Sequence, residues 1–187
     1  YRNMLVVLIV IPMWMNFLLR TYAWMTLLEK RGLINAILAH LSLPAINILY
    51  TDYAVMLGMV YNFLPFMILP IYSVLMKMDR SLLEAAEDLG ADSWTSFRRV
   101  TFPLSLPGVY AGMIMVFMPA VTTFVISRLL GGGQYMLIGN VIEEQFLAIG
   151  NWSFGSAVSV LMMAIILVSM IFLSRYSKEG SGGGMFF

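Results

Sequence analysis

SLLEAAEDLG, residues 81–90, is the most strongly charged stretch of a very apolar chain. Ser81 is followed three residues later by Glu84, a capping-box pattern, which predicts that a helix begins at Ser81. Gly90 is well placed to end this helix by adopting a left-handed conformation. We therefore expect a capped helix of about two turns here.

The predicted helix has two different faces. Glu84, Glu87 and Asp88 follow i, i+3, i+4 spacing, so they share one face. Leu82, Ala86 and Leu89 line another. One side of this helix is therefore acidic and the other apolar.

A second short helix is expected directly after the first. Asp92 or Ser93 can cap it, and it carries the two arginines at positions 98 and 99. Pro103 and Pro107 are expected to stop it before a long apolar run begins. The sequence predicts two capped helices with a glycine between them, and we refer to the region around residues 77–103 as the predicted loop.

The composition sets the class of protein. Of 187 residues, 60% are hydrophobic and only 11% are charged, the mean hydropathy is +0.86, and soluble domains carry about 25% charged residues. A bilayer crossing needs about 20 mostly apolar residues. Four runs approach or reach that length: residues 4–19, 53–76, 104–127 and 156–174. Any one could be a buried soluble helix, but four favour an all-α integral membrane protein with four transmembrane helices.

The charges between these runs indicate an orientation. With the predicted loop inside, the inner side holds seven Lys and Arg residues: Arg2, Lys77, Arg80, Arg98, Arg99, Arg175 and Lys178. The outer side holds four: Arg20, Lys30, Arg31 and Arg128. Positive charge gathers on the cytoplasmic side of membrane proteins, so the predicted loop is expected to be cytoplasmic.

The segments between the spans have their own patterns. Interfacial helices are expected over residues 22–28 and 33–41, and an amphipathic helix in the outer interface over residues 136–149, its polar side carrying Asn140, Glu143 and Glu144. Pro65 and Pro70 should kink the second span, either beside a pathway or for packing alone. Residues 177–187 are read as a flexible glycine-serine tail without a function.

No enzyme constellation is present, so we expect the chain not to be an enzyme. The glycines at 131–133 are followed by Gln134 and Tyr135 rather than by Gly-Lys-Ser/Thr, so the phosphate-binding loop of an ATPase is absent there. The apolar cores hold no ionisable residue that could relay protons or ions. With no Cys and a single His40, no metal site is expected. Energy for transport would have to come from outside the chain.

The predicted loop also resembles a known signature. Glu84-Ala85-Ala86, Gly90 and the residues VTFP at 100–103 resemble the E-A-A-x3-G-x9-I-x-L-P signature of importer-type (type I) ABC transporter permeases, with Val and Phe replacing its Ile and Leu. In that family this loop is the coupling helix, which docks in a cleft of the ATPase subunit. The resemblance implies these coupling residues: Glu84, Ala85, Ala86, Glu87, Gly90 and Pro103. The alternative is an ordinary solvated loop helix.

Further stretches resemble the spermidine/putrescine branch of these permeases, and within it the subunit called the B-type permease. They are IPMWMNFLLRTY at 11–22, LPFM at 64–67, LEAAEDLGA at 83–91, LLGG at 129–132 and LIGN at 137–140. The resemblance covers nearly all of residues 1–176, which we expect to be a permease domain. Family members have about six spans, and the chain opens without Met, so we expect its upstream part to be missing. Many relatives carry an acidic residue near position 128, where this chain has Arg128.

The resemblance also implies an assembly. Its expected members are a second permease subunit, two ATP-binding subunits and an external substrate-binding protein, in a bacterial inner membrane that the chain crosses several times. ATP and Mg would be bound by the ATPase partner, with no cofactor in this chain and no nucleic acid partner. The same architecture could instead carry sulfate, thiamine, iron or phosphonate. Outside transport, a membrane scaffold or a channel is the alternative, and an adjacent ATPase gene would favour the importer.

A polyamine pathway would use aromatic faces and polar groups, because rings attract ammonium groups by about 0.5–2 kcal/mol each. The candidates are Trp14, Asn16, Tyr22, Trp24, Asn62 and Phe124. Packing, or an aromatic belt at the membrane surface, is the alternative role for each of them.

Overall fold

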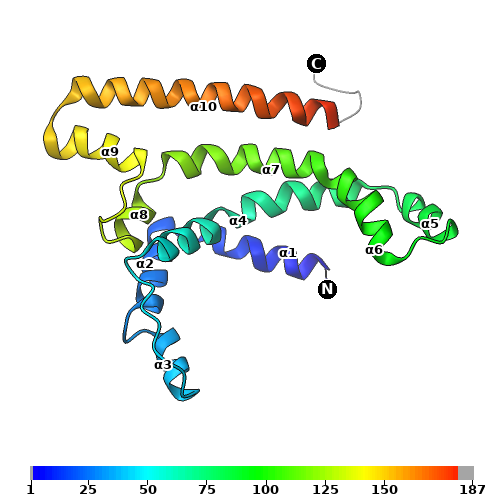
Figure 1. Ribbon diagram of the computed structural model, residues 1–187, viewed down its shortest axis with the longest axis horizontal. Coiled ribbons are helices and arrows are strands. Elements are labelled where there is room, and N and C mark those ends of the chain that lie inside the picture. Colours follow the sequence, from blue (N-terminus) through cyan, green and yellow to red (C-terminus); the bar gives the residue numbers. More distant parts are fainter. Residues whose placement is uncertain (1, 181–187) are drawn as a thin grey trace. The chain divides into compact units, whose positions relative to one another are not determined.

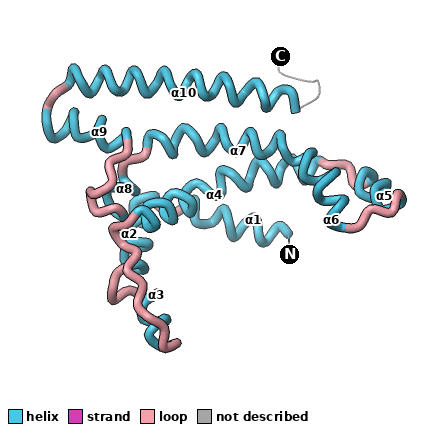
Figure 2. Tube along the Cα trace, viewed as in Figure 1, coloured by secondary structure: helices cyan, strands magenta, loops and turns pink. Residues whose placement is uncertain are grey.

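The computed structural model describes residues 2–180 of the chain, with side chains at residue 4 and at residues 7–174. Within this part the regular structure is helical and no strand occurs (Figures 1 and 2), which confirms the all-α fold class. The helices are α1 (Arg2–Val10), η1 (Ile11–Trp14), α2 (Phe17–Leu28), α3 (Leu33–His40), α4 (Asp52–Lys77), α5 (Ser81–Asp88), α6 (Ser93–Ser96), η2 (Phe97–Thr101), α7 (Phe102–Thr122), α8 (Val125–Leu130), α9 (Ile138–Glu144), η3 (Gln145–Ile149) and α10 (Trp152–Gly180).

Three helical stretches in the described part are long and apolar enough to cross a membrane. They are Asp52–Lys77, Ser93–Thr122 and Trp152–Ser174. A fourth crossing arises only if the bent pair Val7–Trp14 and Phe17–His40 counts as one span. The predicted number of four spans therefore depends on that bent pair.

The first predicted span, residues 4–19, is broken in the structure. Pro12 lies in the short 3-10 helix η1, and the chain bends by 105° before α2 continues. The side chain of Asn16 accepts a hydrogen bond from the backbone N–H of Leu18 at 2.8 Å, so Asn16 caps a new helix. Hydropathy alone missed this break because a 3-10 turn can be as apolar as a helix.

The third predicted span, residues 104–127, is shifted toward the N-terminus. Its helix begins at Ser93 and ends at Thr122, after which α8 starts at Val125. The prediction that Pro103 and Pro107 stop a separate helix is therefore wrong. Residues Phe97–Thr101 form a π-helical segment directly before Pro103, and such a segment widens the helix where the proline ring would clash with the preceding turn.

Helix α4 runs unbroken from Asp52 to Lys77 through Pro65 and Pro70, and the kink at these prolines stays a prediction. Both segments predicted as interfacial helices are helical, as α2 and α3, although α2 begins at Phe17, earlier than expected. Their place at the membrane interface stays a prediction. The predicted amphipathic helix begins at Ile138 and is π-helical over its last five residues, Gln145–Ile149. Of the predicted tail, residues 177–180 belong to α10, and residues 181–187 lie outside the described part.

The residues group into two compact units. The first contains residues up to Pro65 together with Pro119–Met162. Its core is formed by Leu28, Ala54 and Leu130, which bring together α2, α4 and α8. Gly58 allows the close approach of α4 and α8, since a Cβ there would lie 2.8 Å from Cδ2 of Leu130.

The second unit contains Phe66–Met118 and the residues from Met163 on. Here α7 approaches α4 through two glycines. A Cβ on Gly108 would lie 2.8 Å from Cα of Ile71, and one on Gly112 would lie 2.8 Å from the sulfur of Met67. Small residues let helix backbones come this close, which is a common way of packing helices in membranes.

Candidate functional site

The candidate site is the elbow, which we define as residues 79–101, comprising α5, α6 and η2 in the second unit. Helix α5 begins at Ser81, as predicted, but the predicted capping box of Ser81 with Glu84 is wrong. The carboxylate of Asp79 accepts a hydrogen bond from the backbone N–H of Ser81 at 3.0 Å. This backbone bond is the main reason that the pKa of Asp79 lies below its ordinary value. The side chain of an Asp two residues before the first helical residue can accept a hydrogen bond from that residue's backbone N–H. Asp79 does so here, and it takes the place of the predicted capping box.

The end of α5 follows the prediction. Gly90 has φ +80°, in the left-handed region. The backbone N–H of Gly90 donates to the carbonyl of Glu87 at 2.8 Å, and that of Ala91 donates to the carbonyl of Ala86 at 3.0 Å. These two bonds form a Schellman motif, which satisfies the last carbonyls of the helix and sets the direction of the chain after it.

The acidic face of α5 is exposed, and so is most of its predicted apolar face. Glu84, Glu87 and Asp88 are exposed. Leu82 is also exposed, and Leu89 is 89% exposed, so neither is packed in the chain. Ala86, which belongs to the predicted apolar face, and Leu83, which does not, are the partly buried residues of this helix. The elbow thus presents carboxylates and a bare leucine to its surroundings.

Helix α5 packs beside α6 and η2 (Figure 1), and a cavity of about 380 Å³ lies in the elbow. Its lining comes from both arms of the elbow: Ala86, Leu89, Gly90, Ala91, Thr95, Ser96, Arg99 and Val100. We call it the elbow pocket. Asp92 is the N-cap residue of α6, and the Thr95 hydroxyl lowers the pKa of its carboxyl.

Ser96 stands out in the elbow pocket. It is 7% exposed, and its Oγ is buried without a hydrogen-bond partner. Arg99, which lines the same cavity, is exposed, and no ion pair within the described residues involves it. The Ser96 hydroxyl is therefore enclosed within the elbow, whereas Arg99 is open to solvent.

Exposed aromatic rings lie along α6, η2 and the start of α7. The rings of Trp94 and Phe97 stack with centroids 5.8 Å apart, and Phe97 lies 6.4 Å from Phe102. All three are exposed. Exposed rings at the start of a membrane-length helix are typical of the boundary between membrane and water.

In the first unit, Asn140 organises a polar network. Its Oδ1 accepts from the Ser127 hydroxyl at 2.5 Å and from the Leu137 backbone N–H at 3.1 Å. Its Nδ2 donates to the Phe124 carbonyl at 3.0 Å. Asn140, predicted on the polar side of this helix, therefore uses its side chain to tie α9 to the start of α8.

Beside this network, the Arg128 guanidinium pairs with the Glu143 carboxylate. The Glu143 side chain is only 14% exposed, against 65% for Arg128. Both line a cavity of about 340 Å³, which Tyr135 and Glu144 also line. Arg128 thus has a carboxylate of its own chain as its partner.

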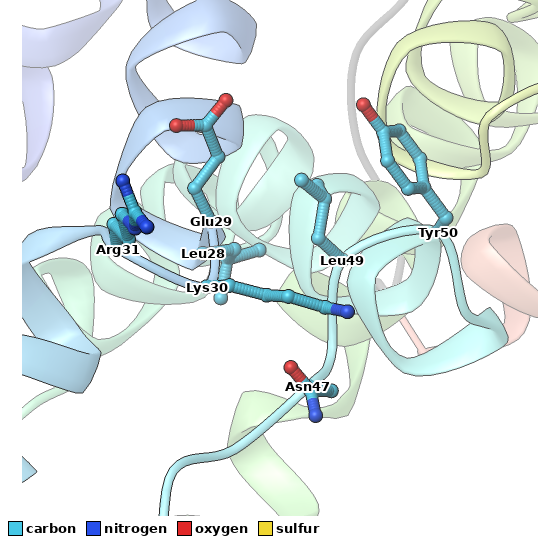
Figure 3. A pocket seen from close by; sticks show the side chains of 7 residues that line it. All are labelled: Leu28, Glu29, Lys30, Arg31, Asn47, Leu49 and Tyr50. Atoms are coloured by element: carbon cyan, nitrogen blue, oxygen red, sulfur yellow. The ribbon is translucent and has the colours of Figure 1, made fainter.

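A further cavity of about 360 Å³ lies at the α2–α3 connection (Figure 3). Figure 3 shows the Lys30 side chain extending toward Asn47 and Leu49 of the other segment, whereas the Glu29 and Arg31 side chains point away from that segment. Asn35 holds the two segments together: its Nδ2 donates to the carbonyls of Glu29 and Ile46, and its Oδ1 accepts from the Ile46 N–H. This cavity has no unused buried polar group that would indicate a ligand.

The structure does not gather the six candidate pathway residues into one cluster. Trp14 is 89% exposed and Tyr22 is also exposed. Trp24 packs edge-on against Tyr61, with centroids 5.1 Å apart, and lies against the core of the first unit. Phe124 contributes its carbonyl to the Asn140 network and exposes its ring.

Among the six candidate pathway residues, Asn62 is the one whose surroundings are least typical of a side chain that only packs. It is 2% exposed, its Nδ2 donates to the Gly58 carbonyl at 2.8 Å, and its Oδ1 has no partner. An unused acceptor in a membrane-length helix is unusual, because such groups are costly to bury. Its role as a pathway residue stays a prediction.

Sequence reasoning missed Ser96 and Arg99 as a pair, and Asn140 as a structural centre. Residues 96 and 99 are three apart on a helix, a spacing that could have placed them on one face. For Asn140 the sequence could signal only the local bond from the Leu137 N–H, because its other partners come from residues 124 and 127. In the described part no group of three or more His, Cys, Asp or Glu could hold a metal ion.

Comparison with known proteins agrees with this architecture. Over 175 residues the chain is 45% identical to the spermidine/putrescine transport system permease protein PotB of Haemophilus influenzae, covering 92% of this chain and 61% of that protein. It is 41% identical over 179 residues to PotB of Escherichia coli K12, covering 95% and 65%. It is 35% identical to the inner membrane ABC transporter permease protein YdcU of the same organism, covering 89% and 57%. The chain thus spans about three fifths of the length of these relatives.

A solved structure shares the fold. A chain of the bacterial alginate ABC transporter, in complex with an alginate pentasaccharide-bound periplasmic protein, superposes with a TM-score of 0.81 at 17% identity, covering 99% of this chain and 68% of that one. At this identity the match shows the fold alone. The family model described as "Binding-protein-dependent transport system inner membrane component" matches residues 1–179. The chain is therefore an integral membrane protein that belongs to the family of binding-protein-dependent transport system inner membrane components.

Proposed function

We propose that the chain is a permease subunit of an ATP-driven polyamine importer, with spermidine and putrescine as substrates. The observation that carries the importer role is the elbow. It ends a helix with three exposed carboxylates at a Schellman turn, between two membrane-length helices. Such a projection can pass movement between a soluble motor and the spans.

The names of the relatives support the substrate class. Proteins named as spermidine/putrescine permeases are 41–45% identical to this chain over most of its length. The fold does not select the substrate, because the structural neighbour belongs to an alginate transporter. Polyamines are cations with apolar segments, so a pathway of rings and amide oxygens fits them.

The proposed assembly contains a second permease subunit, a pair of ATPase subunits that bind ATP and Mg, and an external substrate-binding protein. The chain would lie in the bacterial inner membrane, crossing it several times, with the elbow on the cytoplasmic side. The elbow would dock on the ATPase, and alternating access would expose the pathway to each side in turn. Trp14, Trp24 and Asn62 are the pathway residues that we would test first.

The test is uptake of radiolabelled spermidine by cells that lack their own polyamine importers and produce the assembled complex. Glu84→Lys should abolish uptake and substrate-stimulated ATP hydrolysis while the chain still inserts, because it reverses a charge at the docking helix. Trp24→Ala should lower uptake more than membrane-inserted protein. Uptake of sulfate or thiamine in place of spermidine would overturn the substrate, and normal coupling in Glu84→Lys would overturn the role of the elbow.

A further inference from the structure

The cavity of about 340 Å³ that α8, α9 and their connection line, which we call the α8–α9 pocket, contains an unequal ion pair. The side chain of Glu143 is 14% exposed, whereas that of Arg128 is 65% exposed. A largely buried carboxylate needs a cation beside it, because an uncompensated buried charge is costly. The guanidinium is mostly hydrated already, so it can leave at little cost. The pair therefore favours exchange of one cation for another at a fixed carboxylate.

The charge of the α8–α9 pocket also favours a positively charged ligand. Its lining holds one guanidinium, of Arg128, against two carboxylates, of Glu143 and Glu144, which leaves an excess of one negative charge. No ion pair within the described residues involves Glu144. The internal pair thus satisfies only one of the two acids, and a cation that enters meets a net attraction.

The rest of the lining indicates an organic cation. Met136, Leu147 and Ala148 are exposed and supply apolar wall, and Tyr135 can supply a ring, whose face attracts ammonium groups. In the part of the chain that the structure describes, no group of three or more His, Cys, Asp or Glu could hold a metal ion. A short alkyl chain that ends in an ammonium group matches both the acids and the wall.

We propose that the α8–α9 pocket binds a terminal ammonium group of a polyamine. Glu143 is the carboxylate that holds it, and Arg128 is a tethered competitor that swings into water when the ligand arrives. This inference rests on the proposed function, and it adds a binding step that none of the six candidate pathway residues provides. A small inorganic cation gains nothing from the apolar wall, so it should not displace Arg128.

The first experiment measures the affinity of the chain for radiolabelled putrescine, in nanodiscs of neutral lipid and at fixed ionic strength. Arg128→Gln should bind about fivefold more tightly, because it removes a competitor held by an ordinary exposed ion pair. Glu143→Gln should bind at least about tenfold more weakly, the usual effect of losing a charged hydrogen-bond partner. A chain that misfolds does not gain affinity, so a purely structural role of the pair cannot produce the first result.

The matched controls are Arg31→Gln and Glu29→Gln. Both residues are exposed, belong to the same compact unit and do not line the α8–α9 pocket. They remove the same charges from the chain without touching the site, so each should change the affinity less than about twofold. If Arg128→Gln and Arg31→Gln changed the affinity equally, the attraction would be long-range only and the proposal would be overturned.

Competing ligands test the chemical class. Unlabelled spermidine should displace the labelled putrescine, because it carries the same terminal ammonium group on an alkyl chain. Ammonium chloride and potassium chloride, at the same ionic strength, should displace far less of it, since neither cation has an apolar stem. Displacement by potassium as effective as that by spermidine would show a site for any cation and would overturn the proposal.

Uptake by the assembled transporter separates this inference from the proposed function. If the unsubstituted complex imports no polyamine while the chain binds putrescine with the expected effects of both variants, the proposed function fails and the binding site stands. If the complex imports polyamine while Arg128→Gln and Glu143→Gln bind putrescine as their controls do, only this inference fails.

Discussion

Single glycines serve two different physical purposes in this chain. Gly90 has positive φ and open space around it, so its value lies in backbone freedom. Gly108 lies within helix α7 and faces the backbone of α4, so its value lies in the absence of a side chain. A side chain added at these two positions is therefore harmful for different reasons, backbone strain at Gly90 and overpacking at Gly108.

Gly90→Val should reduce substrate-stimulated ATP hydrolysis, because a β-branched residue is poorly tolerated at φ +80°. Gly90→Asn should retain most of it, since asparagine tolerates the left-handed region and a Cβ there meets nothing within 4 Å. The assay is hydrolysis by the assembled complex with the binding protein present. Equal activity of both variants would mean that the Schellman turn is not needed for coupling.

Gly108→Ala should destabilise the protein by about 1–3 kcal/mol, the usual effect of overpacking. The new Cβ would lie 2.8 Å from Cα of Ile71 and 2.9 Å from the carbonyl oxygen of Pro70, and backbone atoms cannot rotate away. Gly155→Ala is the control, because there the Cβ meets only side-chain atoms of Phe146 and Gln145. Thermal unfolding in detergent should show a clearly larger drop for Gly108→Ala, and a similar drop for both would contradict the close approach of α4 and α7.

Asn140→Ala should lower the stability of the first unit by about 2–3 kcal/mol, at about 1 kcal/mol for each of three lost hydrogen bonds. Asn151→Ala removes one exposed cap bond, to the Phe154 N–H at 3.2 Å, and should cost about 1 kcal/mol. Hydrogen exchange at the amides of α8 and α9 would locate the loss. Unchanged exchange in α8 would show that Asn140 does not hold the two helices together.

At the scale of elements, the form of the elbow depends on short-range features of the sequence at the helix ends. An aspartate starts α5, a glycine ends it, and a π-helical segment carries the next helix through Pro103. Each device satisfies or removes a backbone hydrogen-bonding group at a helix end or a kink. The elbow can therefore keep its form while its exposed carboxylates and rings remain free for a partner.

The start of α5 should depend on pH through Asp79. Its pKa is lowered in the folded chain, so its contribution to α5 is present at neutral pH and is lost as pH falls through that lowered value. Ser81→Pro removes the donating N–H at a position where proline suits a helix, and should bring the pKa of Asp79 back toward its ordinary value. Ser81→Ala keeps the backbone bond, which is the larger cause, and should leave most of the shift.

The measurement is an NMR titration of the Asp79 carboxyl carbon in the two variants and the unsubstituted chain. Equal pKa values in Ser81→Pro and Ser81→Ala would show that the backbone bond does not hold Asp79.

At the scale of the whole molecule, the orientation can be tested cleanly because the chain has no cysteine. Ser93→Cys in the elbow and Gln134→Cys in the α8–α9 connection both place a thiol at an exposed position. In cells that produce the chain without the ATPase, a membrane-impermeant maleimide should label Gln134→Cys directly. It should label Ser93→Cys only after permeabilisation. Labelling of both thiols in intact cells would contradict the proposed topology.

The sequence by itself determined the class, most of the helical segments, and the residues at which α5 begins and ends. Apolar runs long enough to cross a bilayer can only be helices or a closed barrel, and the lengths here suit helices. The left-handed conformation of Gly90 at the end of α5 was predictable, because it depends on the type of one residue and not on distant contacts. The signature around Glu84 pointed to the family, which the relatives then showed.

Only the tertiary structure decided which side chains meet. The Asn140 network joins residues 13 to 16 positions apart, and the Asn35 clamp joins residues up to 11 apart. The break of the first span at residues 11–16 and the continuous helix through Pro103 depend on 3-10 and π turns, whose apolar residues look like any helix. The sequence also gives no sign that the Ser96 hydroxyl is buried without a partner, because that burial arises only in the folded chain. Periodicity along a chain specifies faces, whereas burial and pairing arise from how those faces meet.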